Sequence, residues 1–185
     1  ARHSRYCDGF FRVSNDELES FLAGEICTTK YRNRIVFPTN DFHVRILSRR
    51  RDELGRYYRL STDDPAVIDL FYNKINTYRL AVRAGVPIPL TFFPGRKEDL
   101  DDPEIPFPCI VKPAVMYDFH RKTGKKVFLC NDRNELRQAY DRALQVIPAS
   151  EIIVQEVIPG DGRDQFSACF LYIGGRTYVK LTACR

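Results

Sequence analysis

The stretch IIVQEVIPGDGRDQFSACF, residues 152–170, begins as a buried strand and then changes character. Its first apolar, β-branched residues are typical of a strand that is covered on both faces. Gln155 and Glu156 then place an amide and a carboxylate on this strand, and a Pro-Gly-Asp turn precedes a second strand. Buried polar groups need hydrogen-bond partners, so this end of the strand is either a polar outer face or an edge that binds something.

The chain from residue 87 onward predicts an antiparallel sheet with helices packed on one face. Short strands are expected at 87–93, 107–113, 126–130 and 151–158, and Gly174-Gly175 is the two-residue signal of a hairpin between two longer strands. Asp132 and Glu135 have capping-box spacing and predict a helix that ends before Pro148. Its apolar stripe consists of Leu136, Ala139, Tyr140, Ala143, Leu144 and Ile147.

The preceding part of the chain has a different order of helices and strands. Residues 14–23 predict a helix, 34–37 a strand, 41–50 a helix and 57–60 a strand, which is the order of a parallel α/β layer. Asp64 before Pro65 starts a further helical stretch, which runs to Gly85 with a break near Asn73. The predicted class is therefore α/β (α+β), with a partial parallel segment at residues 1–63 and a second domain at 64–185.

Composition indicates a globular protein, because 44% of the 185 residues are apolar and 29% are charged. No apolar run is long enough to span a bilayer and no signal peptide is recognisable, so the cytoplasm is the expected location and no membrane partner is expected. The six cysteines lack the spacing of a zinc site, and we expect buried free thiols. The net charge of +5 is modest, and the cluster at Arg49–Arg51 suits a solvated helix face or a small anion.

Several polar positions interrupt apolar segments. Lys112 ends the strand PCIVKP, where it either reaches solvent or meets an anion. Lys74 stands near the start of a helix, a position that disfavours a cation unless an anion is bound there. Glu156 to Ile158 would offer backbone donors and acceptors beyond the sheet. Asp161 and Asp164 follow closely, either as turn residues or as acceptors for a pair of hydroxyl groups.

The order of these segments resembles the first half of the ATP-grasp fold, in the carboxylate-amine ligase group that includes carbamoyl phosphate synthase large chains and D-aspartate ligase-like proteins. The resemblance covers residues 64–185, from YNKINTYRLAVRAGVPIPLT through PFPCIVKP to IIVQEVIPG and the hairpin. Residues 1–63 resemble the tail of the α/β domain that precedes it in such enzymes. The resemblance implies that the chain is a piece of a longer protein.

The resemblance also implies roles in binding ATP. Lys74 would approach the phosphates, and Lys112 would contact the nucleotide near the α-phosphate and the adenine. Gln155, Glu156 and Ile158 would form the adenine hinge, mainly through the backbone of the last two. Asp164, or alternatively Asp161, would accept the ribose hydroxyls.

Two departures from the family pattern follow. The glycine-rich lid over the phosphates is replaced by AVMYDFHRKTGKKV, a basic loop in which His120 and Lys126 are the proposed phosphate contacts. The alternative for this loop is a mobile surface segment with solvated charges. The Mg²⁺ ligands of the family lie on strands after the hairpin, so we expect the metal to be held outside this chain, and we assign no catalytic or metal-binding residue within it.

The predicted function is therefore the ATP-binding part of a ligase that activates a carboxylate as an acylphosphate, which an amine then attacks. Its expected partners are ATP and small-molecule carboxylate and amine substrates. Without Mg²⁺ ligands, we do not expect turnover by this chain alone. Two alternatives stay open: a nucleotide-binding module without catalysis, and a basic nucleic-acid-binding domain that uses Arg49–Arg51 and the basic loop.

Overall fold

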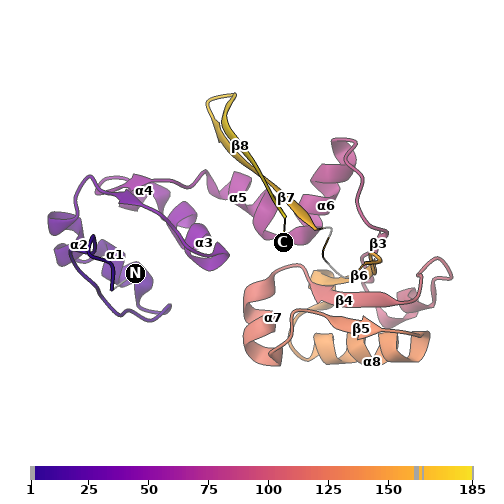
Figure 1. Ribbon diagram of the computed structural model, residues 1–185. Helices are drawn as coiled ribbons and strands as arrows, with labels where there is room; N and C mark the ends of the chain where they lie inside the picture. Colours follow the sequence, from indigo (N-terminus) through magenta and orange to yellow (C-terminus); the bar gives the residue numbers. More distant parts are fainter. Residues whose placement is uncertain (1–2, 161–162, 164, 185) are drawn as a thin grey trace. The chain divides into compact units, whose positions relative to one another are not determined.

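The computed structural model describes residues 3–160, 163 and 165–184. The chain divides into two compact units: Ala1–Ile88 with Pro113–Lys126, and Pro89–Lys112 with Val127–Arg185. This division follows packing, and the domain boundary expected between residues 63 and 64 stays a prediction. No helix in the described ranges has the length and apolar character needed to cross a membrane. Figure 1 shows the elements of both units in chain order.

The first unit opens with short helices around a small parallel sheet. Its elements up to residue 60 are α1 (Leu18–Ala23), α2 (Glu25–Lys30), β1 (Ile35–Val36), α3 (Asp41–Arg49), α4 (Arg51–Leu54) and β2 (Arg59–Leu60). β1 pairs with β2 in parallel, which confirms the predicted parallel layer. The core beneath it contains Cys27, Leu47, Leu54 and Tyr58.

Two helices of this layer differ from their predictions. The Ser14 hydroxyl donates to the Glu17 carboxylate at 2.7 Å, and regular helix begins only at Leu18, later than predicted. The predicted helix at 41–50 ends one residue early, because the chain turns at Arg50 and begins α4.

The break at Asn73 is confirmed. α5 (Pro65–Tyr72) is capped by Asp64, whose carboxylate accepts the Ala66 N–H, and α6 (Lys74–Arg83) is capped by Asn73, whose side-chain oxygen accepts the Ile75 N–H. Each side chain satisfies a backbone donor that the first turn of a helix leaves without a partner. Lys74 is thereby fixed as the first residue of α6.

The basic segment after Pro113 is a helix, and its prediction as a loop is wrong. α7 (Met116–Thr123) buries Phe119 completely, and Gly124 ends it with a φ of +67°. A left-handed residue after the last turn is a common helix stop, and glycine adopts it at the least cost.

The second unit contains a four-stranded sheet in the order β3-β6-β4-β5. Its elements before the hairpin are β3 (Thr91–Phe92), the 3-10 helix η1 (Lys97–Asp101), β4 (Cys109–Pro113), β5 (Phe128–Cys130), α8 (Arg133–Leu144), the 3-10 helix η2 (Ala149–Glu151) and β6 (Ile152–Glu156). β3 pairs antiparallel with β6, and β4 antiparallel with β5, as predicted. Figure 1 shows α8 covering one face of this sheet.

The apolar stripe of α8 forms the core of this unit. Leu136, Ala139, Tyr140 and Ala143 are buried, whereas Leu144 is 43% exposed and was wrongly included in the stripe. The hairpin follows as β7 (Phe166–Ile173) and β8 (Arg176–Cys184), joined at Gly174-Gly175 as predicted. Its described side chains are all exposed.

Candidate functional site

The first group of predicted site residues lies in the sheet of the second unit. The Lys112 Nζ donates a hydrogen bond to the Gln155 Oε1 at 2.6 Å, and the Gln155 Nε2 donates to the Thr91 Oγ1 at 2.7 Å. Thr91 in turn donates to the Pro89 carbonyl at 2.6 Å. A line of hydrogen bonds thus runs across the neighbouring strands β4, β6 and β3.

Both central members of this line are buried. Lys112 is 9% exposed and Gln155 is 5% exposed. The simpler interpretations, a lysine that extends into water and a strand with a polar outer face, are therefore wrong for these two residues. An ammonium held inside a sheet keeps a fixed direction, which suits it to a ligand that binds in one orientation.

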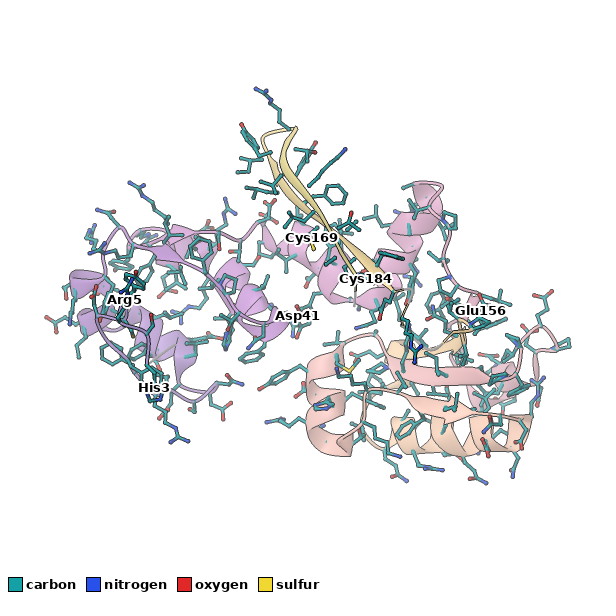
Figure 2. All side chains as sticks on the ribbon, viewed as in Figure 1. His3, Arg5, Asp41, Glu156, Cys169 and Cys184 are labelled. Atoms are coloured by element: carbon teal, nitrogen blue, oxygen red, sulfur yellow. The ribbon has the colours of Figure 1, made fainter. Side chains whose placement is uncertain are left out.

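Glu156, labelled in Figure 2, forms hydrogen bonds with Leu90, the residue before β3. Its carboxylate accepts the Leu90 N–H at 2.7 Å, and its own N–H donates to the Leu90 carbonyl at 3.0 Å. The Val157 N–H donates to the Pro108 carbonyl at 3.4 Å. The expectation that the sheet leaves these backbone groups unpaired is wrong for both N–H groups. Ile158 lies beyond the strand end with a side chain that is 62% exposed, whereas Asp161 and Asp164 lie outside the described residues.

A second group surrounds a pocket of about 460 Å³ in the first unit. Lys74, His120 and Lys126 all line it, although they come from two helices and the segment that follows one of them. The Lys74 backbone N–H donates to the Ala114 carbonyl at 3.0 Å, which links the start of α6 to the segment that leads into α7. The pocket's lining comprises Asn40, Asp41, Phe42, Tyr72, Lys74, Met116, Tyr117, His120, Arg121 and Lys126.

One wall of the pocket is aromatic. Phe42 stacks on Tyr117 with ring centroids 4.5 Å apart and planes inclined by 16°. The Tyr117 hydroxyl accepts a hydrogen bond from the Asn15 Nδ2 at 2.6 Å, which orients its ring. The combination of a stacked wall with several cations suits a ligand that carries both a flat group and negative charge.

Tyr72 adds a half-buried phenol to the lining. Burial raises the pKa of the Tyr72 phenol, and the nearby carboxylates of Asp118 and Asp41 raise it further. The guanidinium of Arg45, which lies 4.9 Å from the ring centroid, lowers this pKa and so opposes the rise. Arg121 forms an ion pair with Asp118 at 3.3 Å.

Residues 40–42 were not included in the site predicted from the sequence, although they line the pocket. The local signal at this place was Asn40, which caps the start of α3 by accepting the His43 N–H at 2.9 Å.

The basic run at Arg49–Arg51 is partly used within the first unit. Arg50 forms ion pairs with Glu53 and, at 3.5 Å, with Glu19. Arg51 donates to the Thr62 carbonyl at 2.6 Å. Two of the three arginines therefore hold neighbouring elements together, which weakens the case for a nucleic-acid surface there.

The acidic and sulfur-containing side chains that the structure describes form no group of three or more that could hold a metal ion. The Mg²⁺ implied by the resemblance therefore has no candidate ligand set within the described ranges, and no step is derived through it.

No family model matches the chain. A curated relative, D-aspartate ligase of Enterococcus faecium, is 28% identical over 149 residues, which are 76% of this chain and 35% of the relative. The chain thus spans about a third of that protein's length.

Solved structures share the fold. L-amino acid ligase from Bacillus licheniformis matches 89% of this chain and 35% of its own, with a TM-score of 0.60 and 16% identity. The ADP complex of N5-carboxyaminoimidazole ribonucleotide synthetase matches 89% of this chain and 44% of its own, with a TM-score of 0.53 and 16% identity. These matches agree with the resemblance found in the sequence: the chain is similar in sequence to D-aspartate ligase, and it shares its fold with these two enzyme structures.

Proposed function

We propose that this chain is the ATP-binding part of a ligase that joins a carboxylate to an amine. The observation that carries the proposal is the buried Lys112 ammonium, held by Gln155 in a sheet of ATP-grasp type. The bond to Gln155 gives the ammonium a fixed direction, and an oriented cation is what a phosphate ligand requires.

In the second unit, Lys112 would contact the nucleotide near its α-phosphate and adenine, and Gln155 would hold the Lys112 ammonium in place. Because the Glu156 N–H is already bonded to the Leu90 carbonyl, the adenine hinge would use the Glu156 carbonyl and the Ile158 N–H. These two groups supply one acceptor and one donor, the pair that the edge of an adenine ring needs. Asp164, or alternatively Asp161, would accept the ribose hydroxyls.

In the first unit, the pocket cations would bind phosphate oxygens. Lys74, His120 and Lys126 line one cavity, and α6 directs the positive end of its dipole to the position of Lys74. His120 lies on α7 and Lys126 on the segment after it, where one basic loop was predicted from the sequence. Side-chain cations would replace the backbone N–H groups of a glycine-rich lid.

The chemistry of the whole ligase would run in two steps. A substrate carboxylate oxygen attacks the γ-phosphorus of ATP, the bond to the β,γ-bridging oxygen breaks, and ADP leaves with that electron pair. An amine nitrogen then attacks the acylphosphate carbon, phosphate departs, and the amine loses a proton. The residues of this chain would contribute binding, orientation and neutralisation of phosphate charge.

The test is calorimetric titration of the 185-residue chain with ATP, and with GTP as a competitor. We expect saturable binding that prefers adenine and weakens at least tenfold in Lys112→Met, which removes the ammonium but keeps the buried stem. The matched control is Lys122→Met, because Lys122 lies on α7 and is not part of the pocket lining. A folded chain that binds no ATP, or that binds it equally well in both variants, would refute the proposed role of Lys112.

A further inference from the structure

Two buried cysteines face each other across the edge of the sheet in the second unit. Cys109 of β4 is the direct register partner of Cys130 of β5 in the antiparallel pair. Both residues are 0% exposed, and both are free thiols. Directly opposed residues of antiparallel strands have Cα atoms about 4.5–5.5 Å apart, which lies within the range that a disulfide spans.

The two thiols are not equivalent. The Cys130 thiol donates to the Phe128 carbonyl at 3.8 Å. Its contact with Cys109 lowers the pKa of Cys109 against the effect of burial, and Arg133 lowers that pKa further. The same contact, together with burial and the nearby Glu135, raises the pKa of Cys130. Because the thiolate is the reactive form, Cys109 is the nucleophile of the pair and Cys130 the thiol that resolves it.

Access to the pair is through the edge strand. β5 is the terminal strand in the sheet order and only three residues long, and its central residue Leu129 is exposed. Short edge strands open locally at a lower free-energy cost than the interior of a sheet. Local opening therefore admits a small oxidant to thiols that are buried in the closed state.

We propose that Cys109 and Cys130 form a reversible disulfide in response to a small peroxide. The Cys109 thiolate attacks a peroxide oxygen, an S–O bond forms, the O–O bond breaks, and the departing hydroxide takes a proton to give water. The Cys130 thiol then loses its proton as its sulfur attacks the Cys109 sulfur, an S–S bond forms, the S–O bond breaks, and the departing hydroxide takes that proton to leave as a second water. Two electrons pass from the thiol pair to the peroxide, and an added dithiol returns them.

The disulfide would act on the segment between the two cysteines. That segment comprises residues 110–129 and contains Lys112, all of α7 and Lys126. The chain leaves the second unit after Lys112 and returns to it at Val127. The cross-link would therefore join β4, from which the chain leaves, to β5, which begins just after its return. Closing this loop covalently restricts the conformations open to α7 and its basic side chains. The inference stands on the strand register and does not depend on nucleotide binding.

The experiment uses the 185-residue chain with Cys7, Cys169 and Cys184 replaced by serine, because these three are exposed or partly exposed. Figure 2 labels Cys169 and Cys184 on the hairpin. The reduced protein is treated with a small excess of hydrogen peroxide, unfolded, alkylated and mapped by mass spectrometry without reduction. We expect Cys109 and Cys130 to escape alkylation and to appear in one cross-linked pair of peptides. Cys27, buried beside Tyr58, is the internal control and is expected to be alkylated in full after the peroxide treatment. Dithiothreitol is expected to restore the thiols of Cys109 and Cys130.

Cys130→Ala is the matched variant. In it, Cys109 is expected to stop at the sulfenic acid, which a dimedone probe traps. If the serine background does not fold, mapping the unmodified chain gives the same readout for the pair. Full alkylation of Cys109 and Cys130 at a peroxide dose that oxidises Cys169 in the unmodified chain would overturn the proposal, as would oxidation beyond the sulfenic acid without a cross-link.

Discussion

The Lys112 Nζ and the Gln155 Oε1 are 2.6 Å apart inside a four-stranded sheet. Gln155 uses both ends of its amide, since its Nε2 donates to Thr91 while its Oε1 accepts from Lys112. The amide that interrupts the apolar strand therefore joins three strands. The same contact would keep Lys112 directed at a ligand.

Replacing Gln155 with leucine tests this linking role. Gln155→Leu keeps a similar volume but removes partners from Lys112 and Thr91, and we expect the free energy of unfolding to fall by about 2–4 kcal/mol. Urea denaturation followed by circular dichroism measures the change. Gln138→Leu, on an exposed position of α8, is the control and should change stability little. A similarly small effect at Gln155 would show that the line of hydrogen bonds contributes little to stability.

Sequence reasoning located the strands and α8 well because burial imposes a clear periodicity on them. The continuous apolar run at 152–154 and the spacing from Leu136 to Ala143 follow from packing in a core, and the Gly174-Gly175 turn follows from local turn geometry. These signals need no knowledge of distant residues, which is why the structure reproduces them.

Tertiary contacts account for what the sequence could not supply. α7 is rich in basic residues, and the burial of Phe119 and the stacking of Tyr117 on Phe42 hold it against the rest of its unit. Gly124 was a readable stop signal. The convergence of Lys74, His120 and Lys126 on one cavity depends on how α6 and α7 pack, which no local pattern encodes.

The cap of α8 provides a second prediction. The Asp132 carboxylate accepts the Glu135 N–H at 2.8 Å, while the Glu135 carboxylate reaches back to the Asn131 N–H at 2.8 Å. Asp132→Ala should lower the free energy of unfolding by about 1 kcal/mol, since the first turn loses a partner for a backbone donor. Thermal unfolding of this variant is compared with that of Asn134→Ala, which is exposed inside the first turn. Equal melting temperatures for both variants would contradict the capping role.

The third prediction concerns Gly124, the residue that ends α7. Its φ of +67° lies in the left-handed region, so Gly124→Ala should lower the free energy of unfolding by about 1–2 kcal/mol even though the added Cβ meets no atom within 4 Å. Gly95→Ala is the matched control, because Gly95 is not among the positive-φ glycines and its Cβ would make ordinary contact with Asp99 at 3.7 Å. Hydrogen exchange along residues 116–124 should rise in the first variant alone. No difference between the two would mean that α7 does not need this stop.

Tyr58 carries the last prediction, which concerns pH. Its hydroxyl donates to the Leu22 carbonyl at 2.7 Å in the core of the first unit, and burial, with a smaller contribution from Cys27, raises the pKa of Tyr58 to about 12. In the unfolded chain the phenol titrates near its ordinary pKa of about 10, so below that pH the group is neutral in both states. Between the two pKa values only the unfolded state loses the proton, and stability therefore falls as pH rises through this window.

Tyr58→Phe removes both the hydrogen bond and the titration. Urea denaturation of the two chains at about pH 8 and about pH 11 should show the wild type more stable by about 1 kcal/mol at the lower pH, with a smaller difference at the higher pH. The comparison cancels the other tyrosines and lysines that titrate in the same range. The pKa of Cys27 is also raised, first by burial, and Cys27 is present in both chains, so Cys27→Ala in each background separates its contribution to the slope. A stability difference that stays constant across this range would show that Tyr58 titrates at the same pH in the folded and unfolded chains, and that its burial does not shift its pKa.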